Sequence, residues 1–329
     1  MAFNFHRLLH LIYVILEIKL HLPKLGISNM KILITGGTGF IGSYLSDAFV
    51  KKGYYVISVG GPLSDNALRH PNLKYVLADT TQKGSWQEEL NDVDAVINLA
   101  GRSIFNRWND DYKKSIHSSR ILTTRNLVEA LPSDRDITLC STSAAGYYGN
   151  RGDDILTENE PAGNDFLATV CTDWEKEAFK AKDKGVRVAV TRFGIVLGKG
   201  GGALKQMIPP IRYFVGGPLG NGKQWFPWIH IEDLISAMLF IFENKSVSGA
   251  LNFTAPGSVR NIELVKTIAG ILHRPAFMPA PAFIIKILLG EFGASILASQ
   301  RVIPERLLKY GFMFKYPDIK SALNNILTT

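Results

Sequence analysis

Short apolar runs and amphipathic segments alternate along most of the chain. Ile32-Leu33-Ile34 suits a strand that is buried on both faces, and apolar residues then recur with helical spacing from Phe40 to Val50. Further runs predict strands at 54–59, 73–78, 93–100, 136–141 and 186–191, with helices around 109–131 and 166–184. Such alternation requires crossovers between parallel strands. The pattern therefore predicts an α/β fold with a doubly wound parallel sheet.

The amino-acid composition changes near Gly198. Glycine and proline are frequent from 200 to 227, and residues 257–329 are mostly helical in pattern with proline breaks. We expect residues 30–199 to form the sheet domain, with a returning segment at about 228–256. The stretches 200–227 and 257–329 are expected to form a smaller, mostly helical C-terminal region.

Residues 1–29 differ from the rest of the chain. The apolar run from Leu8 to Leu16 is too short to span a membrane, charged residues follow it, and no signal-peptidase pattern is present. Met30 opens the first strand directly. We interpret residues 1–29 as an N-terminal extension produced by a misassigned start, with a peripheral membrane helix as the alternative.

Composition and charge give no signal for several classes of partner or site. The net charge of +8 is spread without a Lys/Arg block, so neither nucleic acid nor a membrane surface is implied as a partner. Cys140 and Cys171 are far apart and lack the paired spacing of a zinc site or disulfide framework. We predict no metal, no membrane span and a cytoplasmic location.

The glycines Gly36, Gly39 and Gly42 stand between the first strand and the first helix. Their spacing allows a tight turn and a close approach of a pyrophosphate, which the N–H groups and positive dipole end of the helix stabilise. A phosphate-binding loop of the nucleotidase type is excluded, because no Gly-Lys-Ser/Thr follows. The turn predicts a dinucleotide-binding site, and a glycine turn without a ligand is the alternative.

The later strand ends resemble those of extended short-chain dehydrogenase/reductases. The matching segments are TGGTGFIG at the turn, Asp79 after the third strand, Asn98 to Gly101, Arg192 to Gly198, and GNGKQ followed by WIHIED. The chain is most similar to the atypical, YfcH-like branch of epimerase-family proteins. The strings that carry this resemblance include RWNDDYKKSIHSSR, SAAGYYG, PAGNDFLATVCTDWE and GGPLGNGKQWFPWIHIEDL.

The resemblance implies a Rossmann sheet, a nicotinamide dinucleotide and a set of cofactor contacts. Arg120, within HSSR, belongs to that set, although a surface helix arginine is the alternative. The branch implies NADP, while Gly60 and Gly61 supply neither the acidic residue that binds NAD nor an arginine for a 2′-phosphate. We favour NADP, with NAD as the alternative. The predicted cofactor contacts are Gly36, Thr38, Gly39, Phe40, Ile41, Gly42, Gly60, Gly61, Asp79, Leu99, Ala100, Gly101, Arg120 and Ile195.

The chain departs from the resemblance at the catalytic pair. Leu167 stands where the family has an acid–base tyrosine, and Cys171 stands where a lysine lowers the pKa of that tyrosine. The candidates to take over the chemistry are Ser143, Tyr147 and Tyr148, and both tyrosines are equally compatible with a wall of packed rings. His230 is a further candidate base, with a packing role as the alternative.

The substrate-side motifs also depart from those of nucleotide-sugar epimerases. Phe226 replaces an arginine that would bind a diphosphate, and Ile195 replaces an asparagine. The ligand is therefore expected to be a small molecule, more hydrophobic than a nucleotide sugar. Two hypotheses follow: an NAD(P)-dependent oxidoreductase or epimerase with a rearranged acid–base set, or an NAD(P)H-binding regulatory protein without turnover, as in relatives described as cell-division inhibitors. The resemblance also implies a homodimer.

Overall fold

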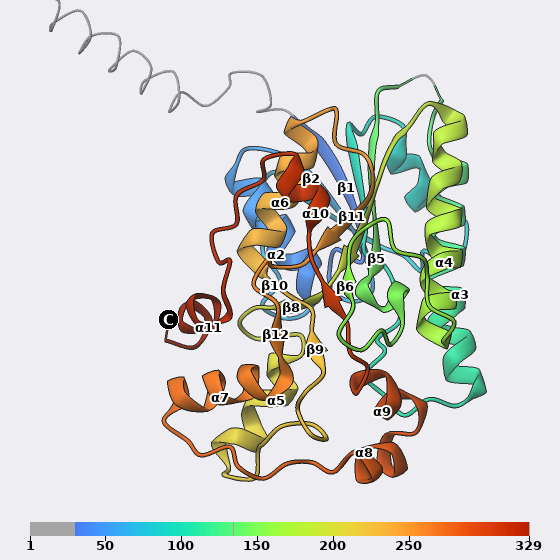
Figure 1. Cartoon of the computed structure of the whole chain (residues 1–329). Coiled ribbons are helices and arrows are strands. Elements are labelled where there is room, and N and C mark those ends of the chain that lie inside the picture. The colour runs from blue at the N-terminus through green and yellow to red at the C-terminus, as the bar shows by residue number, and fades with distance from the viewer. Residues whose placement is uncertain (1–29, 134, 329) are drawn as a thin grey trace, which may run out of the picture.

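A seven-stranded parallel sheet forms the centre of the molecule (Figure 1). The computed structural model describes residues 30–133 and 135–328. The strands are β1 (Lys31–Thr35), β2 (Tyr55–Gly60), β3 (Leu73–Leu77), β4 (Ala95–Asn98), β5 (Thr138–Ala144), β7 (Arg187–Phe193) and β11 (Gly249–Phe253). They lie in the order β3-β2-β1-β4-β5-β7-β11, with every neighbouring pair parallel. The predicted doubly wound sheet is confirmed.

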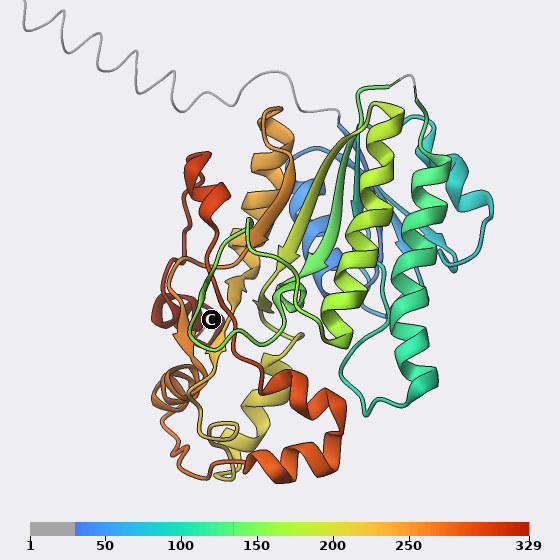
Figure 2. The ribbon, with the colours of Figure 1, turned by 45° about the vertical axis from the view of Figure 1, so that its right-hand side comes forward.

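Helices cover both faces of this sheet. Helices α2 (Phe40–Lys51) and α6 (Ile231–Glu243) share one apolar core with β1 and β4, while α3 (Asp110–Ala130) and α4 (Phe166–Phe179) cover the opposite face. Figure 2 shows α3 and α4 side by side in front of the strands. The chain reverses its winding between β1 and β4, so the carboxyl ends of these strands open a crevice at the edge of the sheet.

Side chains before α3 and α4 fix where these helices begin. Asn109 Oδ1 accepts the amide of Tyr112 at 2.8 Å, and Asp165 Oδ1 accepts the amide of Ala168 at 2.9 Å. The helix expected at 166–184 is divided, because α4 ends at Phe179 and a 3₁₀ helix, η3 (Lys180–Lys184), follows. Two other 3₁₀ helices are η1 (Ser85–Leu90) and η2 (Ala145–Tyr148).

The C-terminal region is mostly helical, as predicted. Its helices are α5 (Leu204–Arg212), α7 (Asn261–Leu272), α8 (Ala282–Leu289), α9 (Glu291–Ile296), α10 (Glu305–Lys309) and α11 (Ile319–Thr328). Three two-stranded ladders lie outside the central sheet: parallel β8 (Ile195–Leu197) with β10 (Trp228–His230), antiparallel β9 (Trp225–Phe226) with β12 (Val259–Arg260), and parallel β6 (Ile155–Leu156) with β13 (Arg301–Val302). The last of these pairs the sheet domain with the C-terminal region.

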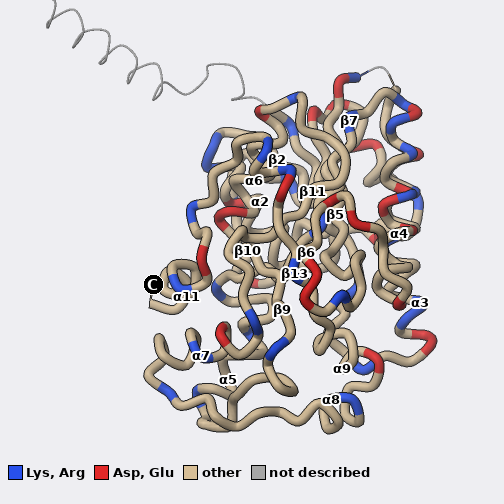
Figure 3. The backbone as a smooth tube through the Cα atoms, in the orientation of Figure 1, with Lys and Arg blue, Asp and Glu red and all other residues tan. Residues whose placement is uncertain are grey.

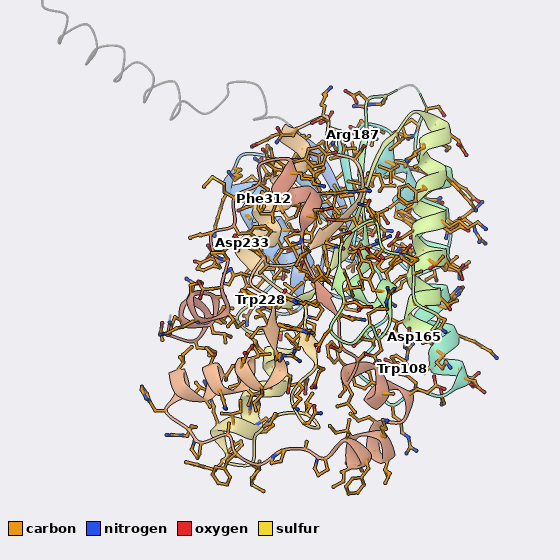
Figure 4. The ribbon with its side chains drawn as sticks, viewed as in Figure 1. Trp108, Asp165, Arg187, Trp228, Asp233 and Phe312 are labelled. Atoms are coloured by element: carbon orange, nitrogen blue, oxygen red, sulfur yellow. The ribbon has the colours of Figure 1, made fainter. Side chains whose placement is uncertain are left out.

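Helix α9 rests against the N-terminal ends of α3 and α4. The ring of Trp108 lies 5.3 Å from that of Phe166 and 5.6 Å from that of Phe292, measured between centroids. An ion pair of 2.7 Å between Lys113 and Glu291 joins α3 to α9. Figure 4, in which Trp108 is labelled, shows that residue beside α9. The C-terminal region therefore closes over the carboxyl-end side of the sheet, where the crevice opens.

Candidate cofactor site and adjoining cavity

The glycine turn packs tightly against the end of β4. Gly36 has a φ of +68°, in the left-handed region that favours glycine. A Cβ atom on Gly36 would lie 3.0 Å from backbone atoms of Leu99 and Ala100, and one on Gly42 would lie 2.5 Å from the Gly36 carbonyl oxygen. A clash with backbone atoms cannot be relieved by a rotamer change, as a clash with a flexible side chain can. These two positions therefore require glycine.

The N-terminus of α2 is open to an anion. Gly39 is its N-cap residue, so no side chain binds the first amides, and the first turn has no acidic residue. Phe40 and Ile41 contribute two of these amides. A Cβ on Gly39 would meet only the Gly36 carbonyl oxygen, at 3.2 Å, and Gly39 is exposed. The uncapped amides, the helix dipole and the empty position above Gly39 fit the pyrophosphate of a dinucleotide.

A buried asparagine holds the loop after β4 next to this turn. Asn98 Oδ1 accepts the hydroxyl of Thr35 at 2.7 Å, and its Nδ2 donates to Thr124 at 2.8 Å. The backbone amide of Leu99 donates to the Thr35 carbonyl oxygen at 3.1 Å. These bonds connect β1, β4 and α3 beneath the crevice. Leu99, Ala100 and Gly101, three predicted contacts, are thereby fixed beside Gly36.

The ends of β2 and β3 meet at the same edge of the sheet. Thr38 covers Gly60, since a Cβ on Gly60 would lie 2.7 Å from Thr38 Oγ1, whereas a Cβ on Gly61 would have no atom within 4 Å. Asp79 is exposed after β3, and its Oδ1 accepts both the amide and the hydroxyl of Thr81, at 3.0 and 2.7 Å. Its Oδ2 has no partner among the described residues. This edge offers one free carboxylate oxygen and open space after β2.

Arg120 lies beneath the loop after β4. A Cβ on Gly101 would lie 3.1 Å from Arg120 Cζ, and the guanidinium lies 5.3 Å from the ring of Trp174. Its Nη1 donates to the carbonyl oxygens of Arg102 and Ile116, at 3.1 and 2.9 Å. No carboxylate among the described residues pairs with it, and burial lowers its pKa. A half-buried cation, with further donors that no described residue accepts, therefore lies beside three predicted cofactor contacts.

Leu167 and Cys171 lie one turn apart on α4. Cys171 is buried, and its Sγ is 3.9 Å from the Ala144 carbonyl oxygen. Burial, with a smaller contribution from Glu175, raises the pKa of this thiol to about 11, although the nearby Arg120 acts in the opposite direction. Cys171 is therefore a neutral thiol at physiological pH. The positive charge next to this position comes from α3 instead of α4.

A buried polar network connects β5, α4, β7 and β11. The Ser143 hydroxyl donates to Glu175 at 2.7 Å, and Arg192 donates from Nε and Nη2 to the two oxygens of that carboxylate, each at 2.8 Å. Arg192 Nη1 also donates to the Tyr148 hydroxyl at 3.0 Å, which in turn donates to Asn252 Oδ1 at 2.7 Å. All five side chains are buried. Each polar group satisfies another, as a stable buried network requires.

The predicted catalytic residues Ser143, Tyr147 and Tyr148 meet around this network. Ser143 and Tyr148 are fully enclosed, and burial raises the pKa of Tyr148 to about 12. Tyr147 is half-buried, and its ring centroid lies 3.5 Å from Arg192 Cζ. Two of the three hydroxyls are thus already bonded within the protein. A catalytic role for these residues stays a prediction.

A cavity of about 930 Å³ lies between the sheet domain and α8–α9. Trp108, Phe166 and Leu167 contribute apolar wall, while Lys286 and Glu291 contribute charge from the opposite side. Figure 4 shows Trp108 and Asp165, another wall residue, at the junction of α3, α4 and α9. Leu167, the residue predicted to stand at the family's tyrosine position, therefore lines a space of ligand size, and it is apolar.

His230 and Ile195 belong to the small ladders. The Nδ1 of His230 accepts the amide of Glu232 at 3.1 Å and caps α6, so its Nε2, 3.1 Å from Asn325 Oδ1, carries the hydrogen and donates it. Burial lowers the pKa of His230 to about 4. Ile195 opens β8 and is half-buried, as is Phe226 at the end of β9. The bonds of His230 are those of a structural cap.

Sequence reasoning missed Glu175 and Asn252 as members of the buried network. A signal was available for each, since an asparagine inside the apolar strand Gly249–Phe253 and a glutamate among the buried residues of α4 both require partners. No comparable signal identified Lys286 or Glu291, because they reach the cavity only through the packing of α8 and α9. Among residues 30–133 and 135–328, no cluster of three or more His, Cys, Asp or Glu side chains could hold a metal ion. The same residues contain no helix long and apolar enough to cross a membrane.

Comparisons with known proteins agree with this geometry. Residues 32–253 match the model of the NAD dependent epimerase/dehydratase family, and residues 280–326 match a domain of unknown function, DUF1731. The chain is 40% identical over 304 residues to the chloroplastic SDR39U1 homolog of Arabidopsis thaliana, covering 91% of this chain and 87% of that protein. It is 37% identical to the epimerase family protein YfhF of Bacillus subtilis, covering 91% and 98%.

Solved structures are similar as well. The human epimerase family protein SDR39U1, determined with NADPH, superposes with a TM-score of 0.79 at 33% identity, covering 91% of this chain and all of that one. A Corynebacterium glutamicum structure described as a nucleoside-diphosphate sugar epimerase gives a TM-score of 0.73 at 32% identity, covering 91% and 58%. The family predicted from the sequence is confirmed. The chain belongs to the NAD dependent epimerase/dehydratase family, as an NAD(P)-binding epimerase-family protein of the SDR39U1 and YfhF type.

Proposed function

We propose that this chain is an NADP(H)-binding regulatory protein that holds a small ligand in the cavity and does not carry out the tyrosine-dependent chemistry of its family. The observation that carries the proposal is Leu167. It lines the cavity where the family has its acid–base tyrosine, and it has no proton to exchange. The neighbouring hydroxyls of Ser143 and Tyr148 are bonded to Glu175 and Asn252.

The preference for NADP over NAD rests on the end of β2. An NAD-specific site has a carboxylate there for the ribose diol, and this chain has Gly60 and Gly61. The space above Gly61 can accept a 2′-phosphate, and the net charge of +8 favours a more anionic dinucleotide. The human SDR39U1 structure, 33% identical, was determined with NADPH. When bound, the nicotinamide would supply hydride chemistry, and Arg120 would contribute the positive charge beside position 171.

The side chains that line the cavity favour a ligand other than a nucleotide sugar. Trp108, Phe166 and Leu167 offer flat apolar surface, and Phe226 stands where epimerases bind a diphosphate with arginine. A pyrophosphate needs several donors, and a lone ammonium such as Lys286 binds only as a point charge. A small, largely apolar molecule with one anionic or carbonyl group fits this wall.

Calorimetry with NADPH and NADH tests the cofactor, and a turnover screen tests the regulatory role. We expect NADPH to bind more tightly than NADH, with no NADPH consumption across a panel of carbonyl compounds and no conversion of UDP-sugars. The double variant Leu167→Tyr with Cys171→Lys restores the acid–base pair, and Leu167→Phe with Cys171→Lys is its control without the hydroxyl. Clear turnover of any screened substrate by the wild-type chain would refute the regulatory proposal.

An oxidoreductase is the second candidate, and one observation favours it. The cavity wall contains Asp165, Lys286 and Glu291, whose side chains can exchange protons with a bound carbonyl compound. Under this alternative the wild-type chain consumes NADPH, and substitution of one of these three residues lowers kcat without weakening NADPH binding. The same turnover screen therefore separates the two functions.

A further inference from the structure

Two segments of the C-terminal region expose large apolar side chains on one side of the molecule. They are residues 213–215, directly after α5, and residues 277–289, which include α8. The amide of Met278 donates to the Gly216 carbonyl oxygen at 3.4 Å, and Arg274 lies 5.2 Å from the ring of Phe214, so the segments are neighbours. We call this surface the apolar face. Its members are Tyr213, Phe214, Val215, Phe277, Met278, Phe283, Ile284, Ile287 and Leu288.

The exposure on this face is unusually large for aromatic and aliphatic residues. Tyr213 is 77% exposed, Phe277 73%, Ile287 68% and Phe283 65%. Figures 1 and 2 both place α5, the segment before α8 and α8 itself at the lower end of the molecule, away from the central sheet. Single exposed apolar residues are common on protein surfaces, but a group of nine across two adjoining segments marks an interaction surface.

The charged residues in the stretches of chain that contain these two segments are all basic. No Asp or Glu occurs from Lys199 to Ile231 or from Leu264 to Gly290, whereas these stretches contain Lys205, Arg212 and Arg274 among other basic residues. Figure 3 shows basic but no acidic positions along the lower edge around α5 and α8. The sequence alone contains no Lys/Arg block, because the fold brings together cations that are about 60 residues apart.

Helix α8 has the character of a segment that lies in a membrane interface. Of its eight residues only Ile285 is buried, and Lys286 is the one polar residue. Phe283 and Ile287 are one turn apart, so they share a side of the helix. Eight residues span about 12 Å, far less than the roughly 30 Å of a bilayer core. A helix this short and apolar can only insert its side chains to shallow depth, parallel to the surface.

We propose that the apolar face docks onto the surface of an anionic lipid bilayer. The exposed rings and aliphatic side chains enter the boundary of the acyl chains, and Arg212 and Arg274 contact anionic headgroups. Charge argues against a second copy of this chain, because a symmetric contact would place these cations together without a carboxylate to compensate. This inference goes beyond the proposed function and does not depend on it.

Co-sedimentation of the full chain with lipid vesicles tests the docking. One set of vesicles contains phosphatidylcholine alone, and the other contains equal parts of phosphatidylcholine and phosphatidylserine. We expect binding to the serine-containing vesicles that weakens with added salt, and at least about tenfold weaker binding to phosphatidylcholine alone. The paired substitutions Phe283→Ser with Ile287→Ser, and Arg212→Gln with Arg274→Gln, should each lower binding by roughly tenfold or more.

Met313→Ser is the matched control, since Met313 is 87% exposed but lies outside the apolar face. Its vesicle binding should equal that of the wild type, and NADPH affinity should be unchanged in every variant, which shows that each has folded. The proposal is overturned if wild-type protein does not sediment with serine-containing vesicles, or if the Phe283/Ile287 variant binds them as the wild type does. Conversion of a wild-type dimer to a monomer by that variant, without vesicle binding, would assign the face to self-association and also overturn the proposal.

Discussion

At the residue scale, the position of a positive charge distinguishes this site from the tyrosine–lysine arrangement. Cys171 replaces the lysine on α4, while Arg120 on α3 lies close enough to affect the pKa of its thiol. We predict that Arg120→Gln weakens NADPH binding by about ten- to a hundredfold. A charge-assisted hydrogen bond contributes about 1.5–3 kcal/mol, and each 1.4 kcal/mol corresponds to about a factor of ten in Kd. Isothermal calorimetry measures the change.

Arg125→Gln is the matched control, since Arg125 is on the same helix but pairs with Glu177 at 2.8 Å on the outer surface. It should leave NADPH affinity unchanged. Adding Cys171→Lys to Arg120→Gln should recover part of the lost affinity, because the new ammonium supplies a charge from α4. Wild-type affinity in a folded Arg120→Gln protein would contradict the assignment.

The sequence allowed Arg120 to be proposed as a contact, but it did not distinguish a free hydroxyl from one already bonded. Ser143 and Tyr148 have suitable chemistry and lie near the end of β5, yet their partners come from α4, β7 and β11. Glu175 and Arg192 form an ion pair with side chains only 7% and 4% exposed. Breaking such a pair typically costs about 3–5 kcal/mol, so these hydroxyls are held in place by the fold's own stability.

At the element scale, a substitution in the glycine turn between β1 and α2 should weaken cofactor binding while leaving the stability of the fold almost unchanged. A Cβ on Gly39 meets only the Gly36 carbonyl oxygen at 3.2 Å, and its φ of −80° suits any residue. We predict that Gly39→Ala lowers the free energy of unfolding by at most about 1 kcal/mol and weakens NADPH binding by roughly tenfold or more, because the methyl group occupies the space of the pyrophosphate. Urea unfolding and calorimetry measure the two effects.

Gly270→Ala provides the control within another helix. Gly270 is exposed in α7, and a Cβ there would have no atom within 4 Å. This substitution should stabilise the protein by about 0.5–1 kcal/mol through helix propensity and leave NADPH affinity unchanged. A Gly39→Ala protein that binds NADPH like the wild type would show that the pyrophosphate does not approach this turn.

Elements with strong local signals were predicted well. The apolar runs identified every strand from β1 to β5 and β7 within a few residues, because the central strands are buried and most of their residues are apolar. The short β6, β8, β12 and β13 have two or three residues each and depend on partners far along the chain. The cavity was not predictable for the same reason: its walls join α4 with α8 and α9, more than 100 residues later.

At the scale of the whole molecule, α6 ties the C-terminal tail to the sheet domain. Asp233, labelled in Figure 4, accepts the backbone amides of Lys315 and Tyr316 at 2.7 and 3.0 Å. The His230 ring lies 3.9 Å from that of Tyr316 and is bonded to Asn325 of α11. The tail therefore depends on buried ionisable groups, and its attachment should respond to pH.

His230 should make the unfolding free energy fall with acidification. Burial lowers its pKa from 6.5 to about 4, with Glu232 raising it and Lys315 lowering it by smaller amounts. Between these two values the unfolded chain binds a proton that the folded protein excludes, so stability falls as pH drops from about 6.5 to about 4. The full loss is about 3 kcal/mol, at about 1.4 kcal/mol for each pKa unit.

We predict that His230→Asn abolishes this part of the pH dependence. Asparagine still caps α6 through its side-chain oxygen, so above about pH 7 the free energy of unfolding of the variant should be within about 1 kcal/mol of the wild-type value. By about pH 5 the free energy of unfolding of the variant should exceed that of the wild type by about 2 kcal/mol. In the wild type, protonation of His230 would replace the acceptor for the Glu232 amide with a second donor. Urea unfolding across this pH range measures the difference.

His273→Asn is the matched control, because His273 is exposed and has a left-handed backbone conformation that asparagine accepts. It should leave the dependence of the unfolding free energy on pH unchanged. Parallel pH profiles for the wild type and His230→Asn would mean that the attachment of the tail does not depend on a neutral histidine.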